Sequence, residues 1–362
     1  MMLKNRLIIL FVYLGDVIPD YVVANANRTA ELFEYEVYLA IEAEARISEK
    51  LKFSPKLSIH KFEELNFKRE FALSHDQEFR NGFWMHTFDR LLAIKEIHRS
   101  LGKKTSILHV ESDMLIMSSF PFEEFLHDKT KWFNHDLYGD VASLVFLPNL
   151  SETEWLYEQL IQEAKVDPLV TDMSALKRIR NRFPESIQTL PDVFSTLHEE
   201  DSRDMFDGLA LGMWLCGVDS RNTYGFQLLH ENSVFAPDGS ITLKEALCGA
   251  HFYLNDNNTL FLRRLGKEIQ VHSLHIHSKD QELFAIDNRA RLERYVQMAM
   301  KQEPQVMKFN YDTFKNLMVQ NLVAGKFSSY IRHLAKFFLK GIGSKQSRLW
   351  ACFVYMIRRD RQ

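Results

Sequence analysis

Cysteine is scarce in this sequence, which has three among 362 residues: Cys216, Cys248 and Cys352. Their number is odd and no two of them have C-x-x-C spacing, which argues against a disulfide framework and against a zinc knuckle. Sparse cysteine is typical of proteins from a reducing compartment, so we expect a cytoplasmic protein.

Long apolar runs are also missing, because no stretch reaches the roughly 18 apolar residues that a membrane-spanning helix needs. The apolar run 7–14 follows two basic residues, Lys4 and Arg6, and residues 24–26 read Ala-Asn-Ala, a pattern with some likeness to a secretion signal and its cleavage site. The run is short and Asp16 follows it almost at once. The sequence therefore favours a first core strand over a signal.

The chain lacks a strong charge of either sign, with a net charge of −3 and a pI near 6.5. This balance predicts no general attraction to nucleic acid. A glycine-rich phosphate loop is missing too, since the first apolar run is followed by Gly15-Asp-Val-Ile-Pro19, which argues against a nucleotidyltransferase. With 46% hydrophobic and 26% charged residues, the composition is that of a soluble globular protein.

Apolar runs and helical periodicity alternate along the first part of the chain. Trp84, Phe88 and Leu91 recur at helical spacing within residues 83–100, and Gly102 ends this predicted helix. Strands are predicted at residues 7–14, 35–41, 56–60, 107–110, 141–147 and 271–277. This rhythm predicts an α/β fold with a Rossmann-like, mostly parallel sheet flanked by helices, and ligands at the carboxyl ends of its strands.

The segment 105–117 carries two carboxylates directly after an apolar strand. Glu111 and Asp113 are two residues apart, so on an extended backbone their side chains point to the same side. Two negative charges in an apolar setting are costly unless a cation cancels them, and a divalent ion with oxygen ligands is the usual partner. The pair therefore predicts a metal site, with two solvated acids at a strand end as the alternative.

A second polar pattern lies late in the chain, in His275-Ile-His277-Ser-Lys279. On an extended strand the two histidines share one face, and neutral imidazole is a ready ligand for a divalent metal. Lys279 follows on the same face, where its ammonium group suits a phosphate. Paired histidines also serve as hydrogen-bonded core residues, which is the alternative for this segment.

Three blocks of the sequence resemble the GT-A-fold glycosyltransferases of the D-x-D type. Residues 107–116 resemble the D-x-D segment of that family, with Glu111 and Asp113 as its acids. Residues 83–92 resemble the preceding helix, in which an arginine, here Arg90, reaches the nucleotide. Residues 275–279 resemble the late histidine motif, and the whole resemblance extends over about residues 7–284.

The resemblance implies a nucleotide-diphosphate sugar as donor and Mn²⁺ or Mg²⁺ as cofactor. Asp113 matches the metal-chelating position, whereas Glu111 departs from the family's aspartate and is assigned to the ribose or the metal. Either His275 or His277 completes the metal shell, and we favour His277 because it lies nearer to Lys279. Lys279 then meets the diphosphate.

Asp207 is the candidate catalytic residue, because Phe206-Asp207-Gly208 precedes a run of small and apolar residues that begins a helix. A carboxylate there would accept the proton of the acceptor hydroxyl or bind hydroxyl groups of the donor sugar. The alternative is a helix N-cap with a favourable contact to the helix dipole.

The expected organisation is a GT-A-like catalytic domain over residues 1–290, a helical insertion over about 151–205, and a basic helical extension over 291–362. The residues from about Lys326 onward mix cations with bulky apolar side chains. Such amphipathic helices suit an anionic membrane surface, which would make the protein peripheral on the inner face of the membrane. The alternative is a final pair of helices packed on the domain.

We therefore expect a glycosyltransferase that moves a sugar from a nucleotide-diphosphate donor to a glycan or lipid-linked acceptor. The metal, Lys279 and Arg90 would neutralise the negative charge of the departing diphosphate. Two alternatives remain: a metal-dependent phosphoester or diphosphate hydrolase, and a non-enzymatic protein that binds a membrane surface through its C-terminal region.

Overall fold

In a computed structural model of the chain, the structure describes residues 6–49, 51–62, 73, 83–126, 129–134, 139–198, 202–216 and 236–301. All of them belong to one of the two units into which the chain divides, the one formed by residues 1–220 and 234–305. The predictions for the basic region after Lys326 lie outside the described residues. No helix of the described part is both long and apolar enough to cross a bilayer.

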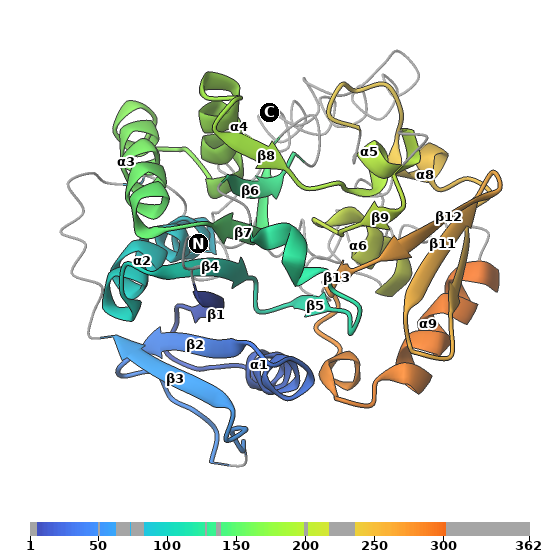
Figure 1. Ribbon diagram of the computed structural model, residues 1–362, viewed down its shortest axis with the longest axis horizontal. Helices are drawn as coiled ribbons and strands as arrows, with labels where there is room; N and C mark the ends of the chain where they lie inside the picture. Colours follow the sequence, from blue (N-terminus) through green and yellow to red (C-terminus); the bar gives the residue numbers. More distant parts are fainter. Residues whose placement is uncertain are drawn as a thin grey trace, which may run out of the picture. The chain divides into compact units, whose positions relative to one another are not determined.

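The main sheet has seven strands, of which only β7 runs against the others (Figure 1). Their spatial order is β3 (Leu57–Phe62), β2 (Glu36–Glu42), β1 (Arg6–Tyr13), β4 (Thr105–Val110), β7 (Val141–Leu147), β6 (Thr130–Phe133) and β8 (Ile187–Thr189). This mixed α/β architecture with a mostly parallel sheet confirms the predicted fold class.

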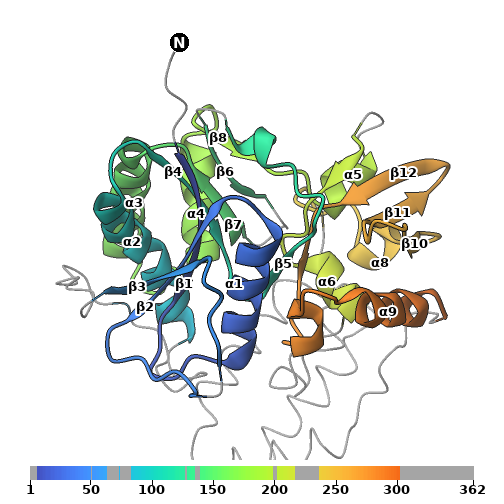
Figure 2. The same cartoon turned by 60° about the horizontal axis from the view of Figure 1, so that its bottom comes forward.

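Helices cover both faces of the sheet, as the alternating side chains of β1 show. Ile9 and Phe11 pack into a core with α1 (Asp20–Leu32) on one face. Leu10 and Val12 pack into another core with α2 (Phe83–Leu101) on the opposite face. Because both faces of β1 are buried, its sequence is a continuous apolar run rather than an alternating one. Figure 2 shows α1 and α2 on either side of the strands.

The segment 151–205 is rich in helix and packs on the main sheet. Its elements are α3 (Leu150–Val166), α4 (Asp172–Arg182), the strand β8, α5 (Val193–His198) and β9 (Asp204–Met205). Leu160 and Leu176 are fully buried in the same core as α2, and β8 forms the edge of the main sheet. Amphipathic helices of this kind bury their apolar side, so the segment is a layer of the fold.

A third core lies around a four-stranded sheet, β10 (His251–Leu254), β11 (Leu260–Arg264), β12 (Lys267–Val271) and β9. The helices of this part are α6 (Ala210–Cys216), α8 (Leu243–Ala246) and α9 (Arg289–Lys301), with a short 3₁₀ turn at η4 (Gln281–Phe284). Another 3₁₀ turn, η2 (Phe122–Phe125), packs into the core of α1. Leu292 and Val296 of α9 pack into the third core, so the boundary expected at residue 290 falls within a helix that belongs to it.

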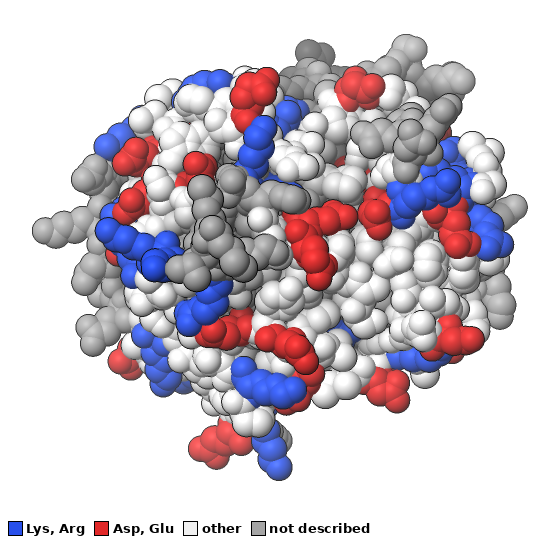
Figure 3. All heavy atoms as spheres, in the orientation of Figure 1, with Lys and Arg blue, Asp and Glu red and all other residues white. Residues whose placement is uncertain are grey.

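This third core meets the core of α1 through a pair of antiparallel strands, β5 (Met114–Ile116) and β13 (Ser273–His275). Both strands are entirely buried. On the face drawn in Figure 3, acidic and basic side chains are interspersed over the described surface, in keeping with the small net charge.

Candidate metal centre

The topology brings together two segments that are far apart in the sequence. Strand β1 pairs with β2 on one side and with β4 on the other, so the winding of the sheet reverses between β1 and β4. Ligand sites of open α/β sheets lie beyond the carboxyl ends of the strands at such a reversal. Glu111 follows the last residue of β4 there, and Asp113 precedes β5. Strand β13 then pairs with β5 and sets His275 opposite Met114.

Three ligand atoms converge at this place. His275 Nε2 lies 3.1 Å from Asp113 Oδ2 and 3.6 Å from Glu111 Oε2. Among the described residues, one carboxylate oxygen of each acid and one nitrogen of His275 form a group in which all atoms lie within 4.8 Å of one another. The side chains of the two acids are each 13% exposed, and that of His275 is 6% exposed. This is the set of oxygen and nitrogen donors that a divalent cation takes.

The tautomer of His275 follows from its other nitrogen. Nδ1 lies 2.9 Å from the carbonyl oxygen of Gly208, which only accepts hydrogen bonds, so Nδ1 carries the proton and donates it. In the neutral ring, Nε2 therefore keeps its lone pair and directs it at the carboxylates. Metal-binding histidines commonly have this arrangement, in which the second nitrogen is fixed by a backbone carbonyl.

Two cations flank the three ligand atoms. Arg90 of α2 forms an ion pair with Glu111, and Lys279 forms one with Asp113. Burial alone would raise the pKa of Glu111, but the charge of Arg90 outweighs it and lowers the pKa. The two acids and the two cations thus balance in charge.

The backbone at Lys279 is held in an unusual conformation. Its φ angle is 56°, in the left-handed region that a residue with a side chain seldom adopts. The following Asp280 accepts hydrogen bonds from Arg291 Nε at 2.7 Å and from the hydroxyl of Tyr295 at 2.6 Å. Helix α9 therefore fixes the turn that returns Lys279 to Asp113.

Asp207 is buried, and its carboxylate binds backbone N–H groups. It is 2% exposed, and its carboxylate accepts the backbone N–H groups of Leu211 at 2.9 Å, Gly212 at 2.6 Å and His275 at 2.8 Å. Burial raises the pKa of Asp207, while these N–H groups, that of His275 first, oppose the rise. The contacts favour the helix-capping alternative, with Asp207 joining the start of α6 to the strand of His275. Its catalytic role remains a prediction.

Gly212 allows α6 to lie directly against β13. A Cβ atom at Gly212 would meet the carbonyl oxygen of His275 at 2.0 Å, a distance that no side chain tolerates. The glycine thus sets the closest approach between the helix that Asp207 caps and the strand that bears His275. The run of small residues after Asp207 was the sequence signal for this contact, although it does not identify the partner.

The structure brings His275, and not His277, to the two acids. Strand β13 ends at His275, and the backbone N–H of His277 donates to the carbonyl oxygen of His275 at 3.0 Å. The two rings stack with centroids 4.3 Å apart and an interplanar angle of 24°. Because the strand has ended, the two histidines do not share a strand face as expected, and the geometry favours His275 as the ligand.

No family model matches the chain, and no curated protein matches it. Among solved structures, it is similar to the glycosyltransferase GlyE of Streptococcus pneumoniae TIGR4, with a TM-score of 0.32 and 9% identity, over 53% of this chain and 46% of that one. The apo form of GlyE gives a TM-score of 0.33 and 11% identity, over 52% of this chain and 45% of that one. The chain thus spans less than half the length of GlyE.

The galactosyltransferase LgtC, in complex with donor and acceptor sugar analogs, is similar with a TM-score of 0.34 and 13% identity. That match covers 51% of this chain and 74% of LgtC. All three structures are glycosyltransferases, but the likeness is partial and remote. The function proposed below therefore depends on the geometry of the site.

Proposed function

We propose that the chain is a metal-dependent glycosyltransferase that moves a sugar from a nucleotide-diphosphate sugar to a glycan or lipid-linked acceptor. The metal ion would be Mn²⁺ or Mg²⁺, held by Asp113, Glu111 and His275. Mixed oxygen and nitrogen donors suit Mn²⁺ better, because Mg²⁺ prefers oxygen alone.

The observation that carries this proposal is the convergence of Glu111, Asp113 and His275. Two carboxylates and the lone pair of a neutral imidazole repel one another unless a cation lies between them. The lone pair is fixed in that direction by the bond from Nδ1 to Gly208. A cluster of acceptors that the fold holds together from two distant segments is a binding site for a cation rather than a source of stability.

The flanking cations indicate what the ion would hold. A divalent cation bound here supplies positive charge beside the diphosphate that leaves when the glycosidic bond breaks. Arg90 and Lys279 are 13% and 20% exposed and lie against the acids. Once the acids coordinate the ion, the guanidinium and ammonium groups would bind the phosphate oxygens of the donor. A diphosphate ligand matches both the charge and the donors of this site.

The test measures nucleotide binding with and without Mn²⁺, by thermal unfolding and by calorimetry with UDP, GDP and other nucleoside diphosphates. We expect at least one of them to stabilise the wild-type chain only when Mn²⁺ is present. Asp113→Asn should weaken this binding by more than about 100-fold, because even the loss of a group that only orients a ligand costs 10–100-fold. The matched control is Asp167→Asn. Asp167 directly follows α3 and pairs with Arg178 of α4 at 2.7 Å, so this variant should bind as the wild type does.

A screen of nucleotide sugars with Mn²⁺ then identifies the donor through slow hydrolysis or transfer. Failure of every nucleoside diphosphate to bind in a metal-dependent way would contradict the proposal. Metal-dependent cleavage of a simple phosphoester without any effect of nucleotides would point to the hydrolase alternative instead.

A further inference from the structure

We infer that helix α1 braces the segment that carries the metal ligands, and that Asn25 is a positioning residue that sets the metal affinity of Asp113. The inference depends on the proposed function, since it concerns the same metal centre. It assigns a role to two buried polar side chains, Asn25 and Arg28, that neither touch the candidate ligands with their own polar atoms nor belong to any motif.

The backbone groups on the two edges of β5 form hydrogen bonds with different partners. One edge faces β13: the carbonyl oxygen of Asp113 accepts from Ile276 N at 2.7 Å, and Met117 N donates to the carbonyl oxygen of His272 at 2.9 Å. Because backbone groups alternate along a strand, the carbonyl groups of residues 112, 114 and 116 face the other edge. No strand pairs with β5 there among the described residues.

Side chains of α1 donate hydrogen bonds to the carbonyl groups of this second edge. Asn25 donates from Nδ2 to the carbonyl oxygens of Ser112 at 3.0 Å and Met114 at 2.7 Å. Arg28, three residues further along the same side of the helix, donates from Nη1 to the carbonyl oxygen of Ile116 at 2.7 Å. The helix thus takes the place of a neighbouring strand, and one amide binds the carbonyl groups of Ser112 and Met114, the residues on either side of Asp113.

This arrangement is costly for folding. Asn25 is 0% exposed and Arg28 is 2% exposed, and burial lowers the pKa of Arg28 to about 10. Within the described residues, Oδ1 of Asn25 and Nε of Arg28 have no hydrogen-bond partner, and burying polar atoms in this state is unfavourable. The bonds that offset this cost all go to the segment 112–116, which starts beside Asp113.

The consequence for the metal centre is a fixed backbone at Asp113. Its own carbonyl oxygen is bonded to Ile276 beside His275, while the carbonyl groups before and after it are bonded to Asn25. Metal affinity depends on how well the ligands are held before the ion arrives, and losing a supporting hydrogen bond costs 10–100-fold in affinity. Asn25 therefore acts on the ion through the position of Asp113.

The experiment compares two asparagines of α1 in the full chain. Asn25→Leu removes both donors in a side chain of similar size, whereas Asn27→Leu removes an amide that bonds the carbonyl oxygen of Lys52 at 2.7 Å and the backbone N–H of Ser54 at 2.8 Å, away from the metal centre. The dissociation constant of Mn²⁺ is measured from the electron paramagnetic resonance signal of the free ion. Thermal unfolding of each variant reports its stability.

We expect Asn25→Leu to weaken Mn²⁺ binding by about 10–100-fold, and Asn27→Leu to change it by less than about 2-fold even where both lower the melting temperature. Asn25→Ser, which keeps one short donor, provides the second variant if the leucine variant does not fold, and its loss should be smaller. A folded Asn25 variant with wild-type affinity would overturn the bracing role. Absence of Mn²⁺ binding by the wild-type chain would instead overturn the metal centre itself.

Discussion

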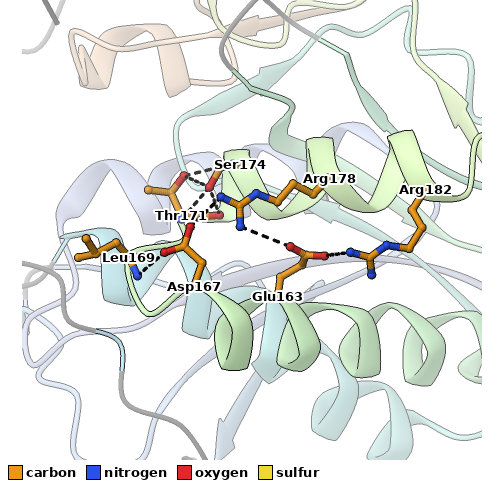
Figure 4. A network of polar contacts seen from close by, with 7 residues as sticks. All are labelled: Glu163, Asp167, Leu169, Thr171, Ser174, Arg178 and Arg182. Atoms are coloured by element: carbon orange, nitrogen blue, oxygen red, sulfur yellow. Dashed lines mark hydrogen bonds and ion pairs between the residues drawn. The ribbon is translucent and has the colours of Figure 1, made fainter. Parts of the chain in front are cut away.

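The candidate metal centre (Glu111, Asp113 and His275) and the polar network between α3 and α4 both place buried carboxylates beside cations. They differ in the other groups that lie against these carboxylates. In the network, Glu163 is 4% exposed and accepts from Arg178 at 3.5 Å and from Arg182, while Arg178 also donates to Asp167 at 2.7 Å (Figure 4). Both arginines remain more than 40% exposed. Every group around these acids is a donor, so the network is complete without a ligand.

At the metal centre each acid also has a cation, but the atom that faces both acids is His275 Nε2, which is an acceptor in the neutral ring. The imidazole nitrogen of His275 faces Asp113 and Glu111 while its N–H is used on Gly208. The flanking cations are less exposed than the arginines of the network. Under the proposed function, the metal centre is distinguished from the network by a surplus of acceptors at one point and not by its buried acids.

The largest expected effect separates the two histidines of the metal centre. His275→Ala removes the acceptor that distinguishes this cluster from the network, so it should weaken Mn²⁺ binding by roughly 100-fold, at the upper end of what losing a supporting group costs. His277→Ala should change it by less than about 3-fold, because that ring stacks on His275 outside the ligand group. Mn²⁺ titration of both variants gives the answer, and the reverse pattern would make His277 the ligand.

Smaller effects, opposite in sign for the ion and for the nucleotide, are expected for Lys279→Met. Without the ammonium group, Asp113 is released from its ion pair, so Mn²⁺ alone should bind up to about 5-fold more tightly. Binding of the nucleoside diphosphate with Mn²⁺ should weaken by roughly 10-fold, because a charged donor to phosphate is lost. Lys95→Met on α2, where Lys95 lies 3.7 Å from Glu96, is the control. Equal changes for ion and nucleotide would contradict the assignment of Lys279 to the diphosphate.

The smallest effect on metal binding is expected for the network itself. Glu163→Gln keeps the shape but removes the charge that pairs with two half-exposed arginines, so stability should fall by about 1 kcal/mol. The dissociation constant of Mn²⁺ should stay unchanged. Urea unfolding and Mn²⁺ titration of the same variant measure both quantities, and a loss of metal affinity would show that the two clusters are not independent.

Much of the fold was predictable because its signals are local. The apolar runs of β1 and β7 and the helical spacing of α2 report burial directly. Glu111 and Asp113 were singled out on the expectation of an extended backbone, but they lie in a turn between β4 and β5, where Met114 N donates to the carbonyl oxygen of Glu111 at 3.0 Å. Their carboxylates converge all the same. His277 was preferred because it lies nearer to Lys279, whereas the geometry favours His275. The strand ends at His275, and no residue pattern marks that end.

Other parts of the site depend on contacts that sequence patterns do not encode. Asn25 binds backbone carbonyl groups, which every residue carries, so nothing in the sequence marks its partners. The signal that remained was a pair of polar residues, Asn25 and Arg28, among the buried positions of α1. Asp207 and Gly212 likewise act on the backbone of His275 across a large distance in sequence.

The most direct test of the central claim is the number of Mn²⁺ ions bound per chain, measured by equilibrium dialysis in the presence of the nucleoside diphosphate that binds best. The wild-type chain should hold one ion at the metal centre, and the double variant Glu111→Gln/Asp113→Asn should hold none while it keeps the wild-type fold. No ion on the wild-type chain, or an undiminished ion on the double variant, would contradict the account.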